Sequence, residues 1–366
     1  MVSITLLLFG GKVQLAYKPN LEEARKYWRA YWAGEIIDRP CTCVRAWKTP
    51  GVHPPGPPNV NGFADWDNSI RLFDEQAATI AWLGEAMPFM QINFGPDQFA
   101  AWLGGDLRHS SVGDESTSWA VPVIQDWDRD AKDIDHLHGD WWRQALEFHA
   151  KAGEAGEGKW LVGMADIHSN MDALSALRGP QDLCIDLHDA PEKIDAAIAA
   201  VRRTFAPCIE GLEKAGRMPG RGYIGWAAFY SETKFAVLQC DFACMVSPEH
   251  FRRWIVPALE EESSYLDHSI YHYDGPDALG HLKDVLSIPH IHTIQWVAGA
   301  GNAPTIEWMD LLKEIQGAGK SLHIGASADE VKLYHKHLRP ERVMYDVWCG
   351  SEQEARDLLS WLKANT

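Results

Sequence analysis

Short apolar runs alternate with amphipathic segments along most of the chain, from Met87 to the carboxyl terminus. Short runs that are apolar throughout are typical of buried parallel strands, and a periodicity of about 3.6 residues between them is typical of helices. Eight runs are expected to be strands, at residues 88–94, 160–166, 222–229, 237–244, 268–274, 291–297, 320–325 and 342–348. Eight strands with interleaved helices predict an α/β protein, a (β/α)8 TIM barrel with an N-terminal helical extension.

The segment before these strands has a different pattern. Helical spacing runs from Leu21 to Ala33 and ends at Gly34, a residue type that commonly terminates helices. A strand-like stretch (41–46) follows, and a second helical pattern covers residues 66–83. We therefore expect residues 21–85 to form a helical amino-terminal layer.

The other boundaries follow from the spacing of the runs. We expect residues 86–366 to form the barrel, with an insertion at about 95–159 that contains a hairpin near 118–124. Residues 1–20 are expected to be an N-terminal extension, either disordered or folded as an extra strand.

Composition and charge exclude several classes of protein. The 46% hydrophobic and 23% charged residues are ordinary for a soluble globular chain. A net charge of −17 disfavours nucleic acid and anionic membranes as partners. The apolar run Ile4–Phe9 is too short to span a bilayer, and seven scattered cysteines fit a reducing compartment, so we expect a cytoplasmic protein. A monomer and a homodimer both remain open.

The sequence around His272 and Asp274 suggests a metal site. The two residues lie two positions apart in an expected strand, so their side chains point to the same face. Cys349 follows another expected strand and would reach the same end of a parallel barrel. One nitrogen, one oxygen and one sulfur ligand suit a catalytic zinc ion with an open fourth position. The alternative is a hydrogen-bonded His–Asp pair and a buried cysteine that packs as an apolar residue.

Further polar residues gather at the expected carboxyl ends of the strands, where barrel enzymes place their active sites. A set of this density is poorly explained by structural roles alone, because buried polar groups without partners destabilise a fold. Its members are Asn93, Asp166, His168, Tyr230, Glu232, Gln239, Asp241, Gln295 and His323.

Several motifs, taken in their order along the chain, carry a resemblance to a known family. They are Tyr31-Trp32-Ala33-Gly34-Glu35 with Asp38-Arg39-Pro40, Asn93-Phe94-Gly95-Pro96, Asp241-Phe242 with Ser247-Pro248-Glu249, His272-Tyr273-Asp274-Gly275, Ile294-Gln295-Trp296 with Gly299-Ala300-Gly301-Asn302, and Trp348-Cys349. From about Leu21 onward the chain resembles the uroporphyrinogen decarboxylase-like superfamily, and within it the branch of corrinoid (cobalamin)-dependent methyltransferases.

Two departures from the family pattern bear on function. The decarboxylases carry an Arg-Gln-Ala-Gly-Arg motif that grips substrate carboxylates, whereas the comparable region here is Val44-Arg45-Ala46-Trp47-Lys48. Zinc in the methyltransferases is held by His-x-Cys and a distant Cys, and these positions fall on His272, Asp274 and Cys349. Aspartate is a harder ligand than the cysteine it replaces, which favours an oxygen or nitrogen methyl donor and also leaves room for a metal-free site.

The resemblance implies a methyltransferase that moves a methyl group from a small O- or N-methylated substrate to a corrinoid protein docked at the barrel mouth. Zinc would act as the Lewis acid, and the corrinoid would be carried by the partner. Glu232, Asp241 and Gln239 are the expected catalytic residues, which orient the substrate or donate a proton. The expected substrate-binding residues are Asn93, Asp166, His168, Tyr230, Gln295 and His323.

Two other functions remain open on the same barrel. A metal-dependent decarboxylase or hydrolase would work without any corrinoid protein. A metal-free small-molecule-binding protein would hold a ligand tightly and contain no metal, with His272 and Asp274 as a structural pair.

Overall fold

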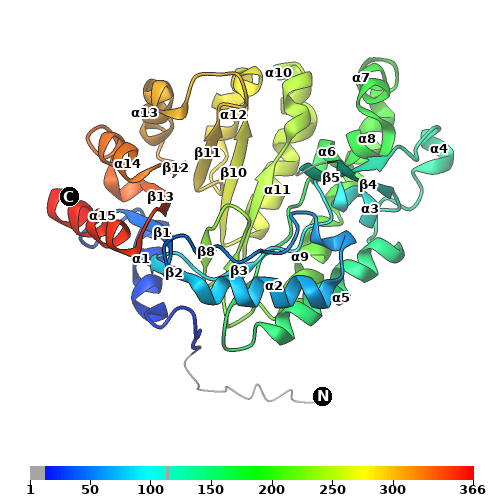
Figure 1. Ribbon diagram of the computed structural model, residues 1–366. Coiled ribbons are helices and arrows are strands. Elements are labelled where there is room, and N and C mark those ends of the chain that lie inside the picture. The colour runs from blue at the N-terminus through cyan, green and yellow to red at the C-terminus, as the bar shows by residue number, and fades with distance from the viewer. Residues whose placement is uncertain (1–12, 113–114) are drawn as a thin grey trace, which may run out of the picture.

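The computed structural model describes residues 13–112 and 115–366 (Figure 1), so most of the expected amino-terminal extension lies outside the described residues. A seven-stranded sheet occupies the centre, in the order β2-β1-β13-β12-β11-β10-β9. Every neighbouring pair in it is parallel except β1 and β2. The strands are β1 (Cys41–Trp47), β2 (Ile80–Gly84), β9 (Phe235–Gln239), β10 (His268–Asp274), β11 (Thr293–Val297), β12 (Ser321–Gly325) and β13 (Val343–Cys349).

Three short strand pairs accompany this sheet. Two of them are β3 (Phe89–Met90) with β6 (Leu161–Val162), which is parallel, and β7 (Tyr223–Ile224) with β8 (Tyr230–Ser231), which is antiparallel. The predicted hairpin in the insertion is present, but it is formed earlier in the chain by β4 (Asp106–Val112) and β5 (Glu115–Val121). The α/β class is confirmed, whereas this pairing leaves β2 and β9 as edge strands and does not show a closed barrel.

Helices lie to both sides of β10 and β11 in the view of Figure 1. In Figure 1, α13 to α15 lie on one side of β10 and β11, and hairpin β4–β5 lies with α6 to α8 on the other. The longer helices are α1 (Leu21–Ala33), α2 (Trp66–Thr79), α5 (Gly139–Ala155), α6 (Asn170–Arg178), α7 (Pro180–Asp189), α8 (Pro191–Arg202), α9 (Phe205–Ala215), α11 (Val256–Tyr265), α13 (Met309–Gly317) and α15 (Glu352–Asn365). The shorter ones are α3 (Gln98–Trp102), α4 (Trp127–Asp130), α10 (Pro248–His250), α12 (Leu282–Ser287) and α14 (Ala328–Tyr334).

Within the described ranges, no helix combines the length and the apolar character needed to cross a bilayer.

The amino-terminal layer contributes more to the sheet than its helical pattern indicated. The helix expected over residues 66–83 ends at Thr79, and the apolar residues after it form strand β2. Strand β1 lies between β2 and β13 in the central sheet. Residues 80–83 are therefore a correction to the sequence prediction, because pairing with β1 outweighs the local helical spacing.

A second correction concerns the strand expected at 222–229. Strand β7 ends at Ile224, and a turn in which Ala228 has φ 59° leads into the antiparallel β8. The chain therefore reverses direction before Tyr230, so that Tyr230 and Glu232 return to the amino end of β9. The strand expected at 237–244 likewise ends at Gln239, and the 3-10 helix η2 (Asp241–Met245) follows it.

Helix α1 covers the amino ends of β10 and β11. The Tyr31 hydroxyl lies 2.7 Å from Thr293 Oγ1, at the first residue of β11. The Trp32 ring stacks on His268, at the first residue of β10, with ring centroids 4.4 Å apart. These contacts hold α1 against the amino end of the sheet, the end opposite to that of His272 and Asp274.

Candidate active site

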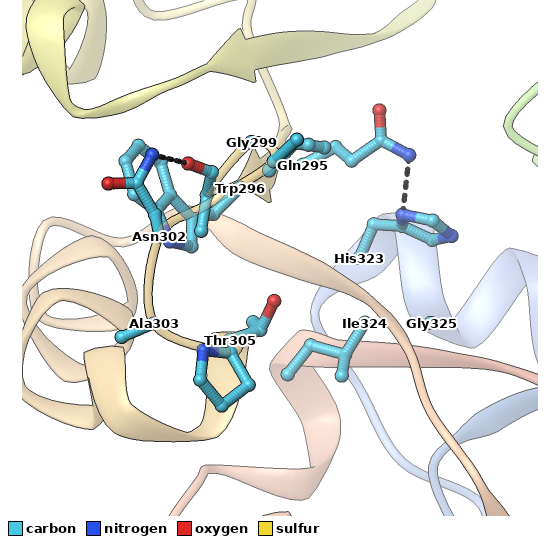
Figure 2. Close-up of a pocket in the computed structure, with 13 residues that line it drawn as sticks. Gln295, Trp296, Gly299, Asn302, Ala303, Thr305, His323, Ile324 and Gly325 are labelled. Atoms are coloured by element: carbon cyan, nitrogen blue, oxygen red, sulfur yellow. Dashed lines mark hydrogen bonds between the residues drawn. The ribbon is translucent and has the colours of Figure 1, made fainter.

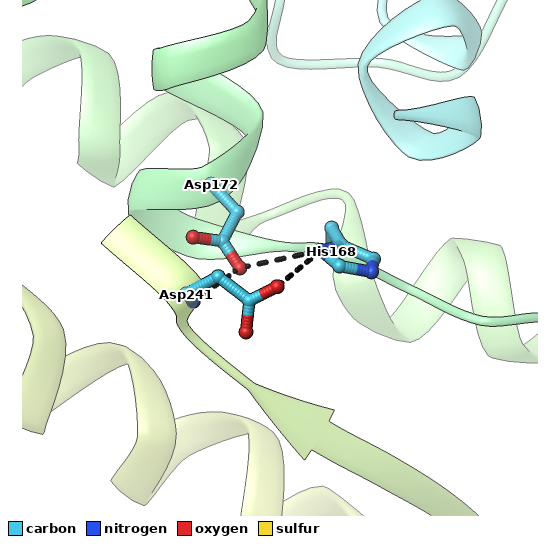
Figure 3. Close-up of side chains that lie close together, drawn as sticks. All are labelled: His168, Asp172 and Asp241. Atoms are coloured by element: carbon cyan, nitrogen blue, oxygen red, sulfur yellow. Dashed lines mark hydrogen bonds and ion pairs between the residues drawn. The ribbon is translucent and has the colours of Figure 1, made fainter. Parts of the chain in front are cut away.

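Asp241 belongs to two groups of side chains that could hold a cation at the carboxyl end of the sheet. One group is His168, Asp172 and Asp241, and the other is Asp241, His272 and Asp274. In each group, one possible ligand atom per residue lies within 4.8 Å of those of the other two. Figure 3 shows the first group, in which both carboxylates point toward the His168 ring.

Backbone hydrogen bonds fix Asp241 in this place. Asp172 lies in the first turn of α6, and its two carboxylate oxygens accept hydrogen bonds from the backbone N–H groups of Asp241 (3.0 Å) and Phe242 (2.8 Å). The start of η2 is thereby tied to the start of α6. His272 and Asp274 reach the same region from β10, where residues two apart share a face.

The His168 ring is surrounded by carboxylates. Its Nε2 lies 3.3 Å from Asp166, and its Nδ1 lies 3.5 Å from Asp172 and 3.7 Å from Asp241. Burial would lower the pKa of His168, but the charges of Asp166 and Asp172 outweigh burial and raise it well above the usual value. These charges therefore favour the protonated imidazolium form of His168.

Asp166 is the main partner of that cation. Burial would raise the pKa of Asp166, but His168 and a 2.7 Å hydrogen bond donated by Gln239 Nε2 lower it below the usual value. Asp166 and His168 therefore form an ion pair that Gln239 helps to hold.

Asp241 behaves differently from Asp166. Partial burial and repulsion from Asp172 raise the pKa of Asp241 to about 6. The Asp241 side chain is still 43% exposed, which limits the contribution of burial and leaves the carboxylate open to a ligand. Asp241 can therefore gain or lose a proton close to neutral pH.

A chain of hydrogen bonds links His272 to two neighbouring strands. His272 Nδ1 donates to Gln295 Oε1 over 2.6 Å, and Gln295 Nε2 donates to His323 Nδ1 over 2.8 Å. Figure 2 shows the second of these bonds. Because Nδ1 of His272 is occupied by Gln295, its Nε2 is the nitrogen left for a metal.

Two cavities adjoin these side chains. A cavity of about 470 Å³ lies over the ends of β11 and β12 and is lined in part by Gln295, Trp296 and His323 (Figure 2). A second, of about 610 Å³, is lined in part by His168, Asp241 and the half-exposed ring of Trp119. Neither lining contains lysine or arginine, and the cation of His168 in the second cavity already faces Asp166, Asp172 and Asp241.

The structure brings together most of the residues singled out in the sequence. They are Asp166, His168, Gln239, Asp241, His272, Asp274, Gln295 and His323. Asp172 was missed, although a signal was present: a carboxylate four residues after His168, in the first turn of the helix that follows a strand.

The structure places four other candidates elsewhere. Asn93 closes its own loop, with Oδ1 accepting from the backbone N–H of Gly95 and Nδ2 donating to the Asn59 carbonyl. Tyr230 and Glu232 bind α1 at the opposite end of the sheet, since Arg25 donates to the Tyr230 hydroxyl (2.8 Å) and Arg29 donates to both Glu232 oxygens (2.5 and 2.8 Å).

Cys349 is the fourth of these. Among the described residues it belongs to neither group of possible ligands, and two strands separate its strand β13 from β10. Burial raises the pKa of the Cys349 thiol to about 11, so the thiol stays protonated. The third side chain beside His272 and Asp274 is the carboxylate of Asp241.

The two groups differ in how well they fit a metal ion. Imidazole and two partly exposed carboxylates are ordinary zinc ligands that leave a coordination position open, and Asp241, His272 and Asp274 supply this set. In the other group both ring nitrogens of His168 face carboxylates, and Asp172 is occupied by backbone N–H groups. The Asp241–His272–Asp274 group therefore has the side chains that fit a metal ion better.

Of three comparisons with known proteins, the one with solved structures found a protein of similar fold. No protein-family model and no curated protein matches the chain. Among solved structures, the chain is similar to a methyltransferase from Methanosarcina mazei, with a TM-score of 0.60 and 12% sequence identity. The match covers 93% of this chain and 98% of that one. Nearly the whole chain therefore shares the fold of that methyltransferase.

Proposed function

We propose that this protein is a methyltransferase that moves a methyl group from a small O- or N-methylated substrate to a corrinoid protein. A zinc ion would be held by Asp241, His272 and Asp274. We also propose that the chain is a (β/α)8 barrel protein of the uroporphyrinogen decarboxylase-like superfamily. The observation that carries the proposal is the meeting of these three side chains beside cavities at the carboxyl end of the sheet.

Two further observations support methyl transfer over porphyrinogen decarboxylation. The chain is similar over nearly its full length to a protein named a methyltransferase. The two cavities beside this site lack lysine and arginine, which a substrate with many carboxylates would need for binding.

The residues around the site suit a reaction in which a heteroatom departs with an electron pair. Zinc, when bound, supplies a Lewis acid that stabilises the growing negative charge on that heteroatom. As the methyl–heteroatom bond breaks, its electron pair stays on the heteroatom, and the positive charge of the nearby His168 imidazolium stabilises the negative charge that develops there. Asp166 and Gln239 keep His168 protonated and oriented. The corrinoid of the partner would supply the acceptor for the methyl group.

The partner would approach the carboxyl end of the sheet, because cobalt must reach the methyl group. Trp119 and Met245 line the larger cavity and are 45% and 51% exposed, respectively, which supports a docking surface at its rim. The substrate would lie between this rim and the Asp241–His272–Asp274 group.

Elemental analysis of the purified protein and its variants tests the metal site. We expect about one zinc per chain in the parent protein, and loss of zinc in His272→Ala and Asp241→Asn. Cys349→Ala is the matched control, because Cys349 is buried outside the group, and it should retain zinc. Loss of zinc in Cys349→Ala together with retention in Asp241→Asn would mean that Cys349, and not Asp241, is the third zinc ligand.

Methyl transfer is tested with cob(I)alamin as acceptor and a panel of methylated ethers and amines as donors. Formation of methylcobalamin, followed by its absorbance, should require the zinc-loaded protein and should fail in His168→Gln. Turnover of a substrate without any corrinoid would instead identify a metal-dependent hydrolase or decarboxylase. A chain that holds no zinc, transfers no methyl group and retains a small molecule tightly would be a binding protein.

A further inference from the structure

Three side chains at facing positions of adjacent strands form one hydrogen-bonded relay. His272 on β10 faces Gln295 on β11, and Gln295 faces His323 on β12 in the parallel register. The two hydrogen bonds measure 2.6 Å and 2.8 Å. Gln295 is 7% exposed and His323 is 9% exposed, so little water competes with either bond.

The chemistry of the amide group gives the relay a direction. Gln295 Oε1 can only accept, so His272 Nδ1 must carry a proton. Gln295 Nε2 can only donate, so His323 Nδ1 must be unprotonated. Burial lowers the pKa of His323 to about 4, which keeps this ring neutral and able to accept. The His323 proton therefore sits on Nε2, which has no partner within the described residues.

We propose that Gln295 is a positioning residue that holds His272 in its Nδ1-protonated tautomer, and that His323 holds the Gln295 amide in the orientation this requires. His272 Nε2 then keeps its lone pair for a cation shared with Asp241 and Asp274. The functional part of this inference, that the tautomer serves metal binding, rests on the proposed metal site. The tautomer itself is inferred from the two hydrogen bonds alone.

The hydrogen bond to Gln295 favours the Nδ1-protonated tautomer of His272, whereas the neighbouring carboxylates would favour the Nε2-protonated one. Asp241 and Asp274 each place a possible ligand atom within 4.8 Å of one on His272. A neutral imidazole without Gln295 would be drawn to carry its proton on Nε2 and donate it to one of these carboxylates, because such charge-assisted bonds are strong. That tautomer has no lone pair for a metal at Nε2. A fixed acceptor at Nδ1 removes the alternative, as hydrogen-bonded carbonyls and carboxylates do for other metal-binding histidines.

Two substitutions of Gln295 separate this role from simple packing. Gln295→Glu keeps an acceptor for His272 Nδ1 and leaves His323 free to change its own tautomer. Gln295→Leu has a similar size but accepts nothing. We expect Gln295→Glu to bind zinc at least as tightly as the parent protein and Gln295→Leu to bind it about 10- to 100-fold more weakly. Asn302→Ala changes another side chain of the same cavity, one that bonds only its own loop, and should leave the affinity unchanged.

A second readout needs neither zinc nor activity. In zinc-free protein labelled with 15N-histidine, the two-bond 1H–15N spectrum reports which nitrogen carries the proton, and signals absent from His272→Gln belong to His272. We expect the Nδ1–H pattern in the parent and in Gln295→Glu, and a shift toward Nε2–H in Gln295→Leu. An Nε2–H pattern in the parent, or a pattern that Gln295→Leu leaves unchanged, would overturn the inference. Absence of zinc binding with the Nδ1–H pattern intact would overturn the metal site and leave the relay standing.

Discussion

The carboxylate of Asp172 accepts a hydrogen bond from the backbone N–H of Asp241 over 3.0 Å and thereby holds Asp241 between His168 and His272. Asp172 is 8% exposed, so water replaces this bond poorly. The contact joins α6 to the loop after β9, two segments that are distant in sequence, and it places the one side chain shared by both possible ligand groups.

Asp172→Ala should therefore destabilise the fold and weaken zinc binding at the proposed metal site. It removes two acceptors for backbone N–H groups, and we expect a loss of about 1 to 3 kcal/mol in the free energy of unfolding, measured in urea. Zinc affinity should fall as well, because Asp241 is no longer held. Ser175→Ala, on the same helix and in the same cavity, should change neither quantity. Equal stability and affinity in Asp172→Ala would mean that η2 holds its position without this carboxylate.

Asp166→Asn should make His168 lose its proton at lower pH. The Asp166 charge is the largest influence that raises the pKa of His168 against burial, and loss of one nearby opposite charge typically lowers such a pKa by about 1 to 3 units. Histidine NMR signals followed against pH measure this directly, with His168 identified from His168→Gln. If methyl transfer needs the imidazolium, the alkaline limb of the pH–rate profile should move in the same direction. An unchanged titration would show that Asp172 and Asp241 are sufficient to keep His168 charged.

Glu262 gives the fold a pH dependence unrelated to substrate. It lies fully buried on α11, and among the described residues neither of its oxygens has a partner in regular hydrogen-bond geometry. Burial, opposed in part by the polar side chains of Ser169 and Asn170, raises the pKa of Glu262 from 4.5 to about 8. Between these values the folded chain binds a proton that the unfolded chain does not, so stability falls as pH rises. Glu262→Gln removes this loss. We expect the parent to lose more than about 1 kcal/mol relative to Glu262→Gln between about pH 5 and pH 8 in urea unfolding.

The matched control for this measurement is Glu260→Gln, since Glu260 is exposed on the same helix. Its stability should follow that of the parent across the pH range. Parallel curves for the parent and Glu262→Gln would show that Glu262 ionises in the folded protein at its ordinary pKa.

Loss of the buried ion pair between Arg39 and Glu85 should strongly destabilise the amino-terminal layer. Arg39 donates to both Glu85 oxygens, over 2.6 Å and 2.8 Å, and Glu85 also accepts from the backbone N–H of Thr42 in β1. Glu85→Gln leaves a buried cation without its counter-charge, and we expect a loss of about 3 to 5 kcal/mol in urea unfolding. Glu75→Gln breaks an exposed ion pair with Arg71 and should cost about 0 to 1 kcal/mol. Similar losses of unfolding free energy in both variants would show that burial does not increase the contribution of the Arg39–Glu85 ion pair.

Much of the fold could be predicted from local patterns. Strands β10 to β13 were predicted to within about two residues, because each is a short apolar run bounded by turns. The Ser327–Glu330 capping box at the start of α14 is likewise a property of four consecutive residues, and it forms with both hydrogen bonds. The pairing of His272 with Asp274 on one face follows from strand alternation alone.

Other features depend on contacts between distant segments, which no local pattern contains. Residues 80–83 have helical spacing but become part of a strand because β1 lies beside them. The turn at Ala228 reverses the chain, so that Tyr230 and Glu232 reach α1 in place of the carboxyl end. Asp241 replaces Cys349 beside His272 because β9 neighbours β10, whereas two strands separate β13 from it. Which residue types can bind a cation is a property of each side chain, but which of them meet is set by strand order and chain direction, and these arise only when the whole sheet assembles.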